Sequence, residues 1–541
     1  MGAATILAGL GVAGAAVLLF MTGANDVANA LGPSVGSRAL TLKQACVVAA
    51  VFEMLGASIV GGSVASTLGD GIAHKCQFAS PVTFVACMLS ALVSAAMWIA
   101  VATKYALPVS STHAIIGGVV AGALVDGGAD AVGGPMLLLT AVSWVTSPLL
   151  GGLASALVYW GSRRLVLNAP YPEQRSEQAA PFLIGGTVAV LVFFVMLGVS
   201  GASVLRDIPW WGFLLLFLGM FFVCAVIAKL LVVPRVAARM DQHDRAVILE
   251  RASTTDRYLN GETKETLVTR NVGIDDANVN LEEKDESTSA SNNKTSDDID
   301  ALNRTFDAAE MGINEQELAS SLGESPSEPA TSPALPSNHS QRADRWFILP
   351  MVMTACCVSF AHGGNDIANA IGPLSELLLF ATTGSLDGSS SATVTLWYVT
   401  PLGGIFIVLG LSIYGKNVMK TVGSGITTLT YSKGFAAQFG AAIAVLFATV
   451  LGMPISTTAV LIGSIAGVGI SDGQGRKSVD LKTVGKIVAG WIVTLPIAGA
   501  LSAIIFVIVR AFLGEQSGWD VLDPRSNCTL YHERMHILYG S

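Results

Sequence analysis

The sequence predicts an all-α polytopic membrane protein built from two related halves, and three observations support this fold class. Hydrophobic residues make up 52% of the 541 positions and charged residues only 13%, and the mean hydropathy is +0.60. A water-soluble protein of this length carries more charge and less apolar surface. Many apolar runs are long enough to cross a bilayer as a helix. In addition, three segments of the first half recur in the same order in the second half.

Ten apolar runs have the length of a membrane-spanning helix. They cover residues 4–22, 41–62, 82–103, 136–160, 181–201, 211–234, 346–362, 395–414, 435–452 and 484–512. Two shorter runs with internal glycines, at 108–125 and 454–470, raise the prediction to about twelve membrane segments. No basic residue precedes the first run, so we predict a retained span there rather than a cleavable signal peptide.

The first repeated segment places one carboxylate and two carboxamides inside an apolar stretch. GANDVANALGP at residues 23–33 recurs as GGNDIANAIGP at residues 363–373, with eight of eleven positions identical. An unpaired charge in a membrane span costs about 2.5 to 3.5 kcal/mol on insertion scales, so a cost incurred twice at matching positions indicates function. The polar residues are Asn25, Asp26 and Asn29 in the first copy and Asn365, Asp366 and Asn369 in the second.

The chemistry of this segment suits a cation beside an anion. The two amides of each copy lie four residues apart, on one face of a helix, and the carboxylate is one position round from the first amide. Their oxygens favour a hard cation such as Na⁺, with Asp26 and Asp366 as the charged ligands, while the amide NH₂ groups can donate to an oxyanion. We expect Gly23, and Gly32 with Pro33, to interrupt the helix and free backbone carbonyls as further ligands.

The second repeated segment is rich in hydroxyl groups. LPVSSTHAIIGG at residues 107–118 is echoed by MPISTTAVLIGS at residues 453–464. Pro108 and Pro454 predict the first residue of a helix in each copy, with hydroxyls in its first turn. Such a helix start presents free backbone N–H groups, the positive end of the helix dipole and hydroxyl donors, which suit an anion. The hydroxyl residues are Ser110, Ser111, Thr112, Ser456, Thr457 and Thr458.

A third pair of segments follows the hydroxyl-rich ones in both halves. WVTSPLLGGLASAL begins at Trp144 and WIVTLPIAGALSAI begins at Trp491. Three elements repeated in one order indicate a duplicated architecture. Duplicated halves are typical of secondary transporters, in which the substrate binds near the membrane midplane where broken helices of both halves meet.

Residues 235–345 separate the two halves and differ from them in composition. They hold 22 acidic and 12 basic residues and are rich in Ser, Thr, Asn and Pro. We predict a disordered acidic loop, because its few apolar residues cannot bury a core. The predicted organisation is a first membrane half at 1–234, this loop, a second membrane half at 346–512 and a polar tail at 513–541.

Arginines at both ends of the loop predict the orientation of the chain. The positive-inside rule counts basic residues close to the spans and places these arginines, with the loop, in the cytoplasm. They are Arg235, Arg239, Arg342 and Arg345.

The paired GANDVANA and GGNDIANA segments, together with PVSSTH, PISTT and the acidic loop, resemble the inorganic phosphate transporter (PiT) family of sodium- or proton-coupled symporters. The likeness covers both membrane halves. It implies two repeats of opposite orientation, two re-entrant helical hairpins, a homodimer with both termini outside, and a plasma-membrane location. It also implies that phosphate binds to the Asn, Asp, Ser and Thr residues of both repeated segments.

The resemblance extends to Glu53 and departs at two other positions. Glu53 matches a glutamate that the family keeps in its second apolar segment, which adds it to the cation-binding set. Gln438 stands where animal members have glutamate, and we place it in the same set. Ala459 replaces a histidine usual in the second half, whereas His113 is present in the first. A neutral Gln438 removes one titratable group, which favours Na⁺ over H⁺ or changes the stoichiometry.

The predicted function is import of inorganic phosphate coupled to Na⁺ or H⁺ by alternating access. Cations at Asp26 and Asp366 would neutralise the site enough for phosphate to bind. The same scaffold could instead carry sulfate or another oxyanion, or act as a phosphate sensor. An intramembrane aspartyl protease is a remote alternative, since two membrane aspartates could share a proton. That chemistry needs neither the matching asparagines nor the hydroxyl-rich segments.

Other classes of protein find no support in the sequence. It shows no zinc-ligand spacing and no nucleophile elbow, so we predict neither an enzyme nor a cofactor. We expect membrane lipid and a second copy of the chain as partners, and no nucleic acid. Cys76 and Cys528 lie in polar segments that could both face outside and form a disulfide.

Overall fold

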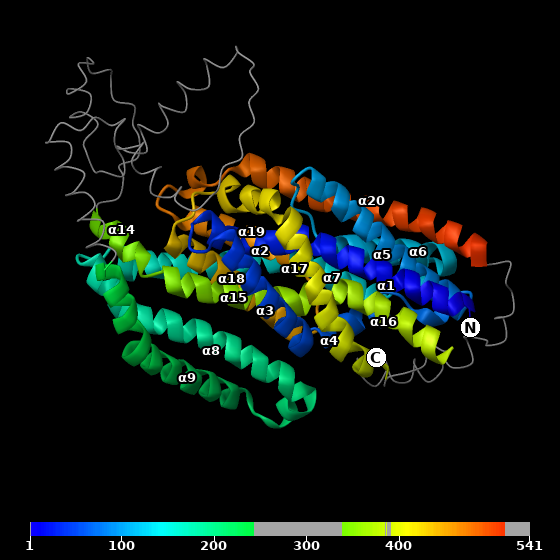
Figure 1. Cartoon of the computed structure of the whole chain (residues 1–541), viewed down its shortest axis with the longest axis horizontal. Helices are drawn as coiled ribbons and strands as arrows, with labels where there is room; N and C mark the ends of the chain where they lie inside the picture. Colours follow the sequence, from blue (N-terminus) through cyan, green and yellow to red (C-terminus); the bar gives the residue numbers. More distant parts are fainter. Residues whose placement is uncertain (1, 243–337, 385, 387–390, 514–541) are drawn as a thin grey trace, which may run out of the picture. The chain divides into compact units, whose positions relative to one another are not determined.

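The computed structural model describes residues 2–242, 338–384, 386 and 391–513 (Figure 1). Within these ranges the chain forms helices joined by turns and short loops, and no strand. The predicted all-α fold is confirmed. Most of the central loop and the polar tail, including Cys528, lie outside the described residues. Cys76 is disulfide-bonded.

The first half contains nine described α-helices. They are α1 (Gly2–Thr22), α2 (Ala28–Gly36), α3 (Leu42–Val60), α4 (Gly62–Ser66), α5 (Pro81–Lys104), α6 (Ser111–Gly127), α7 (Gly134–Ser162), α8 (Pro172–Asp207) and α9 (Trp210–Ile227). Short π-helical and 3₁₀ segments lie between or after them. These are η1 (Gly23–Val27), η2 (Thr67–Gly71), η3 (Lys75–Gln77), η4 (Gly128–Ala131), η5 (Arg163–Leu167) and η6 (Ala228–Val232).

The second half repeats the same order of elements from α15 onward. Its described helices are α14 (Asn338–Arg345), α15 (Ile348–Asp366), α16 (Ala368–Thr383), α17 (Ser391–Gly425), α18 (Tyr431–Val450), α19 (Thr457–Ser471), the 3₁₀ turn η7 (Gly475–Ser478) and α20 (Leu481–Leu513). By the repeated segments, α15 with α16 corresponds to α1 with α2, and α18, α19 and α20 correspond to α5, α6 and α7. The pair α8 and α9 has no counterpart.

Local sequence explains where helices begin, as α5 illustrates. The hydroxyl of Ser80 accepts a hydrogen bond from the N–H of Thr83 at 3.2 Å, and the hydroxyl of Thr83 accepts one from the N–H of Ser80 at 3.1 Å. This reciprocal cap satisfies two backbone donors that a helix start leaves free. Pro81 then occupies the first helical position, where its missing N–H needs no partner.

Among the described residues, ten helices are long and apolar enough to span a membrane, so the chain is a multi-pass membrane protein. One of them runs from Ser111 to Ala131 and contains α6, although its sequence suggested only a short segment. The apolar helices Pro401–Lys416 and Thr457–Ser471 are shorter. A total of about twelve membrane segments stays a prediction.

Both ends of the segment 235–345, which the sequence predicts to be a loop, are helical. Helix continues to Gln242 on one side, and α14 begins at Asn338 on the other. The carboxylate of Asp344 accepts hydrogen bonds from the N–H groups of Tyr431 and Ser432 at 2.9 and 3.0 Å. This contact fixes α14 against the start of α18, and composition alone cannot reveal such a long-range partner.

The last helix of each repeat packs against helices of the other half. Helix α7 of the first half packs against α18 and α19 of the second, whereas α20 of the second half packs against α5 and α6 of the first. Figure 1 shows α20 running beside α5 and α6. Each hydroxyl-rich helix is therefore covered by a helix of the other half, and both halves contribute to one core.

Two glycines make the same close backbone approach in the two halves. A Cβ at Gly23 would lie 1.9 Å from the carbonyl oxygen of Ile407 in α17, and a Cβ at Gly363 would lie 2.1 Å from that of Glu53 in α3. Only glycine fits at such distances. These contacts pair α1 with α17 and α15 with α3, and they make Ile407 and Glu53 equivalent positions.

Candidate functional site

Helical geometry breaks at the Asn-Asp pair in both halves. In the first half the α-helical pattern gives way to the π-helical segment η1 at Gly23–Val27. In the second, α15 ends at Asp366 and α16 begins at Ala368. The prediction that Gly32 with Pro33 interrupts the helix is wrong, because both lie inside α2. Local π-helical geometry is frequent at functional sites because it re-aims side chains.

The hydroxyl-rich segments form helix starts, but proline is not their first residue. Helices α6 and α19 begin at Ser111 and Thr457, and Pro108 and Pro454 lie ahead of them in non-helical backbone. Ser110 is the N-cap of α6, where its hydroxyl accepts a hydrogen bond from the backbone at 3.2 Å. Serine satisfies a free N–H, which proline cannot do. Ser456 caps α19 in the same way.

The first asparagine of each motif makes equivalent bonds in the two halves. The amide of Asn25 donates to Thr103 Oγ1 at 3.1 Å and to the carbonyl of Leu107 at 2.9 Å. The amide of Asn365 donates to Thr449 Oγ1 at 3.2 Å and to the carbonyl of Met453 at 3.1 Å. Each bond set joins the broken helix to the loop ahead of the hydroxyl-rich helix. These asparagine NH₂ groups therefore serve the scaffold.

The polar residues of one half contact those of the other. Asn369 donates to Ser111 Oγ at 3.0 Å and to Thr112 Oγ1 at 3.1 Å. In return, the hydroxyl of Thr458 donates to Asp26 Oδ1 at 3.3 Å. The site that the sequence predicted is therefore assembled from both halves.

Each aspartate also accepts a hydrogen bond from the hydroxyl-rich helix of its own half. The N–H of Ser111 donates to Asp26 Oδ2 at 3.3 Å, and the hydroxyl of Thr457 donates to Asp366 Oδ2. Both carboxylates are almost fully buried. Donors of this kind stabilise a buried carboxylate.

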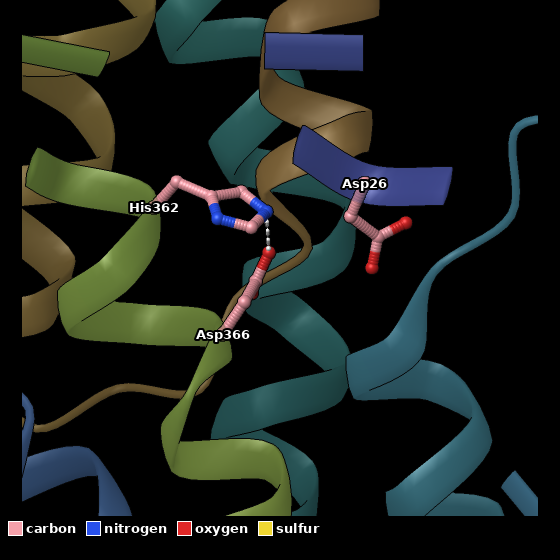
Figure 2. A group of neighbouring side chains, drawn as sticks. All are labelled: Asp26, His362 and Asp366. Atoms are coloured by element: carbon pink, nitrogen blue, oxygen red, sulfur yellow. Dashed lines mark ion pairs between the residues drawn. The ribbon is translucent and has the colours of Figure 1, made fainter. Parts of the chain in front are cut away.

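A histidine that the sequence reasoning missed completes the cluster. His362 lies one helical turn before Asp366 in α15, and its Nε2 is 2.7 Å from Asp366 Oδ2. Ligand atoms of Asp26, His362 and Asp366 all lie within 4.8 Å of one another. Figure 2 shows the imidazole turned toward Asp366, with Asp26 reaching the cluster from a different helix. The four-residue spacing between His362 and Asp366 was the available signal.

Glu53 and Gln438 are both buried and have different surroundings. Glu53 Oε2 lies 2.8 Å from His362 Nδ1, so this residue approaches the cluster through the histidine. Gln438 accepts from the hydroxyl of Ser34 at 2.8 Å and donates to the carbonyl of Ala30 at 3.0 Å. Gln438 therefore joins α18 to α2. The backbone of Asn29 lies in α2, and its side chain is not among those described.

Three buried oxygens of the second copy of the Asn-Asp motif have no hydrogen-bond partner. They are Asn365 Oδ1, Asp366 Oδ1 and Asn369 Oδ1. Unsatisfied buried acceptors are costly, so they indicate a ligand that supplies positive charge or donors. Three carboxylate and amide oxygens fit a hard cation such as Na⁺. A small cavity lies beside the cluster of Asp26 and His362, and Thr457 and Thr458 also line it.

Comparisons with known proteins agree with this chemistry. A family profile described as the phosphate transporter family matches residues 22–502. The chain is 35% identical to an inorganic phosphate transporter 2-1, chloroplastic, of Arabidopsis thaliana, over 91% of this chain and 70% of the relative. It is 30% identical to a putative phosphate permease of Haemophilus influenzae, over 91% and 94% of the two chains.

Two further relatives carry a named coupling ion. The chain is 28% identical to the sodium-dependent phosphate transporter 1-A of Danio rerio, over 89% of this chain and 91% of the relative. A solved structure described as the sodium-dependent phosphate transporter superposes with a TM-score of 0.67 at 28% identity, covering 94% of this chain and all of the other.

Proposed function

The chain belongs to the phosphate transporter family, and on that premise we propose that it imports inorganic phosphate together with Na⁺ by alternating access. The relatives named above are transporters, and the chain is a transporter and not an enzyme. One observation carries the proposal. The carboxylates and the hydroxyl-rich helix starts of both halves meet in a single buried cluster.

Cation binding would offset the electrostatic repulsion between the carboxylates of this cluster. Asp26 and Asp366 are two buried carboxylates close to each other, and like charges repel strongly where the surroundings are poor in water. A phosphate carrying one to two negative charges would add to this repulsion. Na⁺ ions at Asp26 and Asp366, with amide oxygens as further ligands, offset it. Phosphate is therefore expected to bind well only after the cations.

Hydroxyl–carboxylate bonds supply a second reason for coupling. Thr457 donates to Asp366, and Thr458 donates to Asp26. Without a cation, each hydroxyl proton is directed at a carboxylate. A cation bound to the carboxylate offsets its negative charge and so weakens its bond to the hydroxyl, which can then donate to a phosphate oxygen instead. We call this exchange the hydroxyl release, and it makes phosphate affinity depend on the cation.

The anion then lies between the starts of α6 and α19. Backbone N–H groups and the helix dipole at these starts favour negative charge. The hydroxyls of Ser111, Thr112, Thr457 and Thr458 add donors from both halves. Asn369 donates to Ser111 and Thr112. Its amide can therefore stay bonded to these hydroxyls when they turn toward the anion, or it can donate to the anion itself.

The membrane potential provides part of the driving force. Two Na⁺ moving inward with one monovalent phosphate carry one net positive charge, which gains about 2.3 kcal/mol per 100 mV of inside-negative potential. We place the central loop in the cytoplasm and both termini outside, in a homodimer at the plasma membrane. The flanking arginines support this orientation.

Uptake by the purified chain in proteoliposomes tests the proposal. Labelled phosphate should accumulate when an inward Na⁺ gradient is imposed and should fall to the leak rate when choline replaces Na⁺. Uptake that follows a pH gradient and ignores Na⁺ would assign H⁺ instead. Full activity after Asp26→Asn and Asp366→Asn together would contradict the site.

Competition identifies the anion in the same vesicles. Unlabelled phosphate should suppress uptake, whereas sulfate at equal concentration should leave it unchanged. Equal suppression by sulfate would mean a general oxyanion carrier. The turnover number separates a carrier from a slow sensor.

A further inference from the structure

His362 contacts two acidic side chains on opposite sides of its ring. Its Nδ1 lies 2.8 Å from Glu53 Oε2 of α3, and its Nε2 lies 2.7 Å from Asp366 Oδ2 of its own helix. All three side chains are at most 1% exposed. Nδ1 makes a hydrogen bond with Glu53, whereas Nε2 approaches Asp366 as an ion pair without hydrogen-bond geometry. The chain of contacts therefore runs from Glu53 through His362 to Asp366.

The first half has the same framework without this chain of contacts. Thr22 precedes Asp26 by the four residues that separate His362 from Asp366. Ile407 occupies the position of Glu53, since each lies against the glycine that opens the motif. Thr22 and Ile407 are fully buried, and the hydroxyl of Thr22 has no hydrogen-bond partner. Thr22 and Ile407 therefore supply no hydrogen bond or ion pair to Asp26 of the kind that His362 supplies to Asp366.

This difference changes which carboxylate oxygens are free. Asp366 Oδ2 is held by His362 and by the hydroxyl of Thr457, while Oδ1 has no hydrogen-bond partner. In contrast, both oxygens of Asp26 accept hydrogen bonds. The oxygen of Asn25 is also satisfied, by the N–H of Val109 at 3.1 Å. Asn365 and Asp366 therefore each present a free oxygen, whereas the oxygens of Asn25 and Asp26 are all hydrogen-bonded.

We propose that His362, held by Glu53, is a positioning residue that fixes Asp366 with Oδ1 free. The cation site of the second half is then preorganised and binds its ion before the site of the first half. This inference rests on the proposed function, because it takes Na⁺ as the coupling ion. Oδ1 of Asp366 joins the free oxygens of Asn365 and Asn369 in that site. Glu53 then acts by orienting the histidine, as the carboxylate partners of metal-site histidines do.

Na⁺ binding without phosphate tests this role, and we would measure it by Na⁺-dependent thermal stabilisation of the purified full chain. His362→Thr copies the residue of the first half. It should raise the half-saturating Na⁺ concentration about 10- to 100-fold, the range expected when a supporting residue of a metal site is lost. Glu53→Gln should shift it in the same direction by a smaller factor. His362→Gln, which keeps an N–H donor, should recover part of the loss.

Thr22→Val in the first half is the matched control. It removes a hydroxyl with no partner at the equivalent position, so the half-saturating Na⁺ concentration should stay unchanged. A merely structural role would instead lower the melting temperature of His362→Thr in choline and leave the half-saturating Na⁺ concentration unchanged.

The outcomes separate this inference from the proposed function. Unchanged Na⁺ binding in both His362→Thr and Glu53→Gln would overturn the positioning role, even if Asp366→Asn abolishes Na⁺ binding. Unchanged Na⁺ binding and uptake in Asp366→Asn would overturn the proposed site itself. If His362→Thr does not fold, the shift in Glu53→Gln decides the question.

Discussion

The two halves carry the same motif, yet they complete it differently. Asn25 and Asn365 make matching bonds to a threonine and a carbonyl, and Gly23 and Gly363 make the same close approach. Around the aspartates the likeness ends, since Asp366 forms an ion pair with a histidine of its own helix and the described residues give Asp26 no such pair. The hydrogen bonds and backbone contacts around the motif are therefore alike in the two halves, whereas the charged side chains around the aspartates differ. We infer that the two cation sites have unequal affinities.

Removing the carboxylates gives the largest expected difference between the halves. Asp366→Asn leaves the buried His362–Glu53 pair without its third member, and loss of one partner from a buried ionic group costs about 3 kcal/mol or more, which corresponds to about 100-fold. Asp26→Asn also loses a charged cation ligand, but it breaks no ion pair with a histidine of its own helix, so a smaller loss of about 10-fold is expected. Initial rates of Na⁺-driven phosphate uptake measure both. Equal losses would mean that the halves are functionally equivalent.

The hydroxyl release predicts that one substitution weakens phosphate binding and strengthens Na⁺ binding. Thr457→Val removes a donor to phosphate, so the phosphate KM should rise about 10-fold. It also removes the hydroxyl that competes for Asp366, so Na⁺ should bind more tightly in the absence of phosphate. Uptake kinetics and Na⁺-dependent melting measure the two constants. A change of both affinities in the same direction would remove the coupling argument.

The equal scaffold predicts equal losses of stability in the two halves. A Cβ at Gly23 or Gly363 would overlap a backbone carbonyl, and overpacking of this kind costs about 1 to 3 kcal/mol. Gly23→Ala and Gly363→Ala should therefore lower the melting temperature in choline by similar amounts. Gly9→Ala is the control, because nothing lies within 4 Å of a Cβ there. A large difference between the two glycines would show that the scaffold is unequal too.

Ion pairs at the ends of α6 and α19 give the smallest predicted effect. Asp126 pairs with Arg510 at 2.8 Å, and Asp472 pairs with Lys433 at 2.7 Å. The side chains of Arg510 and Asp126 are 47% and 0% exposed, and those of Lys433 and Asp472 are 9% and 25% exposed. Arg510→Gln should cost at most about 1 kcal/mol of stability, because the guanidinium is half-exposed and the buried Asp126 keeps its hydrogen bonds from Ala79 and Thr83. Lys433→Gln should cost more, and the reverse order in thermal melting would contradict this explanation.

The sequence supports the membrane fold and the candidate residues, because both depend on local pattern. Apolar length predicts spanning helices, and two copies of one motif single out Asn25, Asp26, Asn365 and Asp366 without any contact being known. The structure brings these residues together with the hydroxyls of Ser111, Thr112, Thr457 and Thr458, as the duplicated arrangement suggested. Their role in binding remains a proposal.

What the sequence could not indicate depends on contacts between distant segments. The pair of Glu53 and His362 joins residues 309 positions apart, and a single histidine in an apolar helix gives no sign of such a partner. The predicted helix break at Gly32 and Pro33 is also wrong, because Pro33 is tolerated inside α2. Proline removes one N–H, and a membrane helix packed in protein accommodates this loss.

Phosphate binding to the purified chain, with and without Na⁺, tests the central claim most directly. If cations release the hydroxyls, saturating Na⁺ should lower the phosphate Kd by at least about 10-fold relative to choline, and phosphate should tighten Na⁺ binding by the same factor. Asp366→Asn should abolish this dependence. A phosphate Kd that is the same in Na⁺ and in choline would contradict the coupled site.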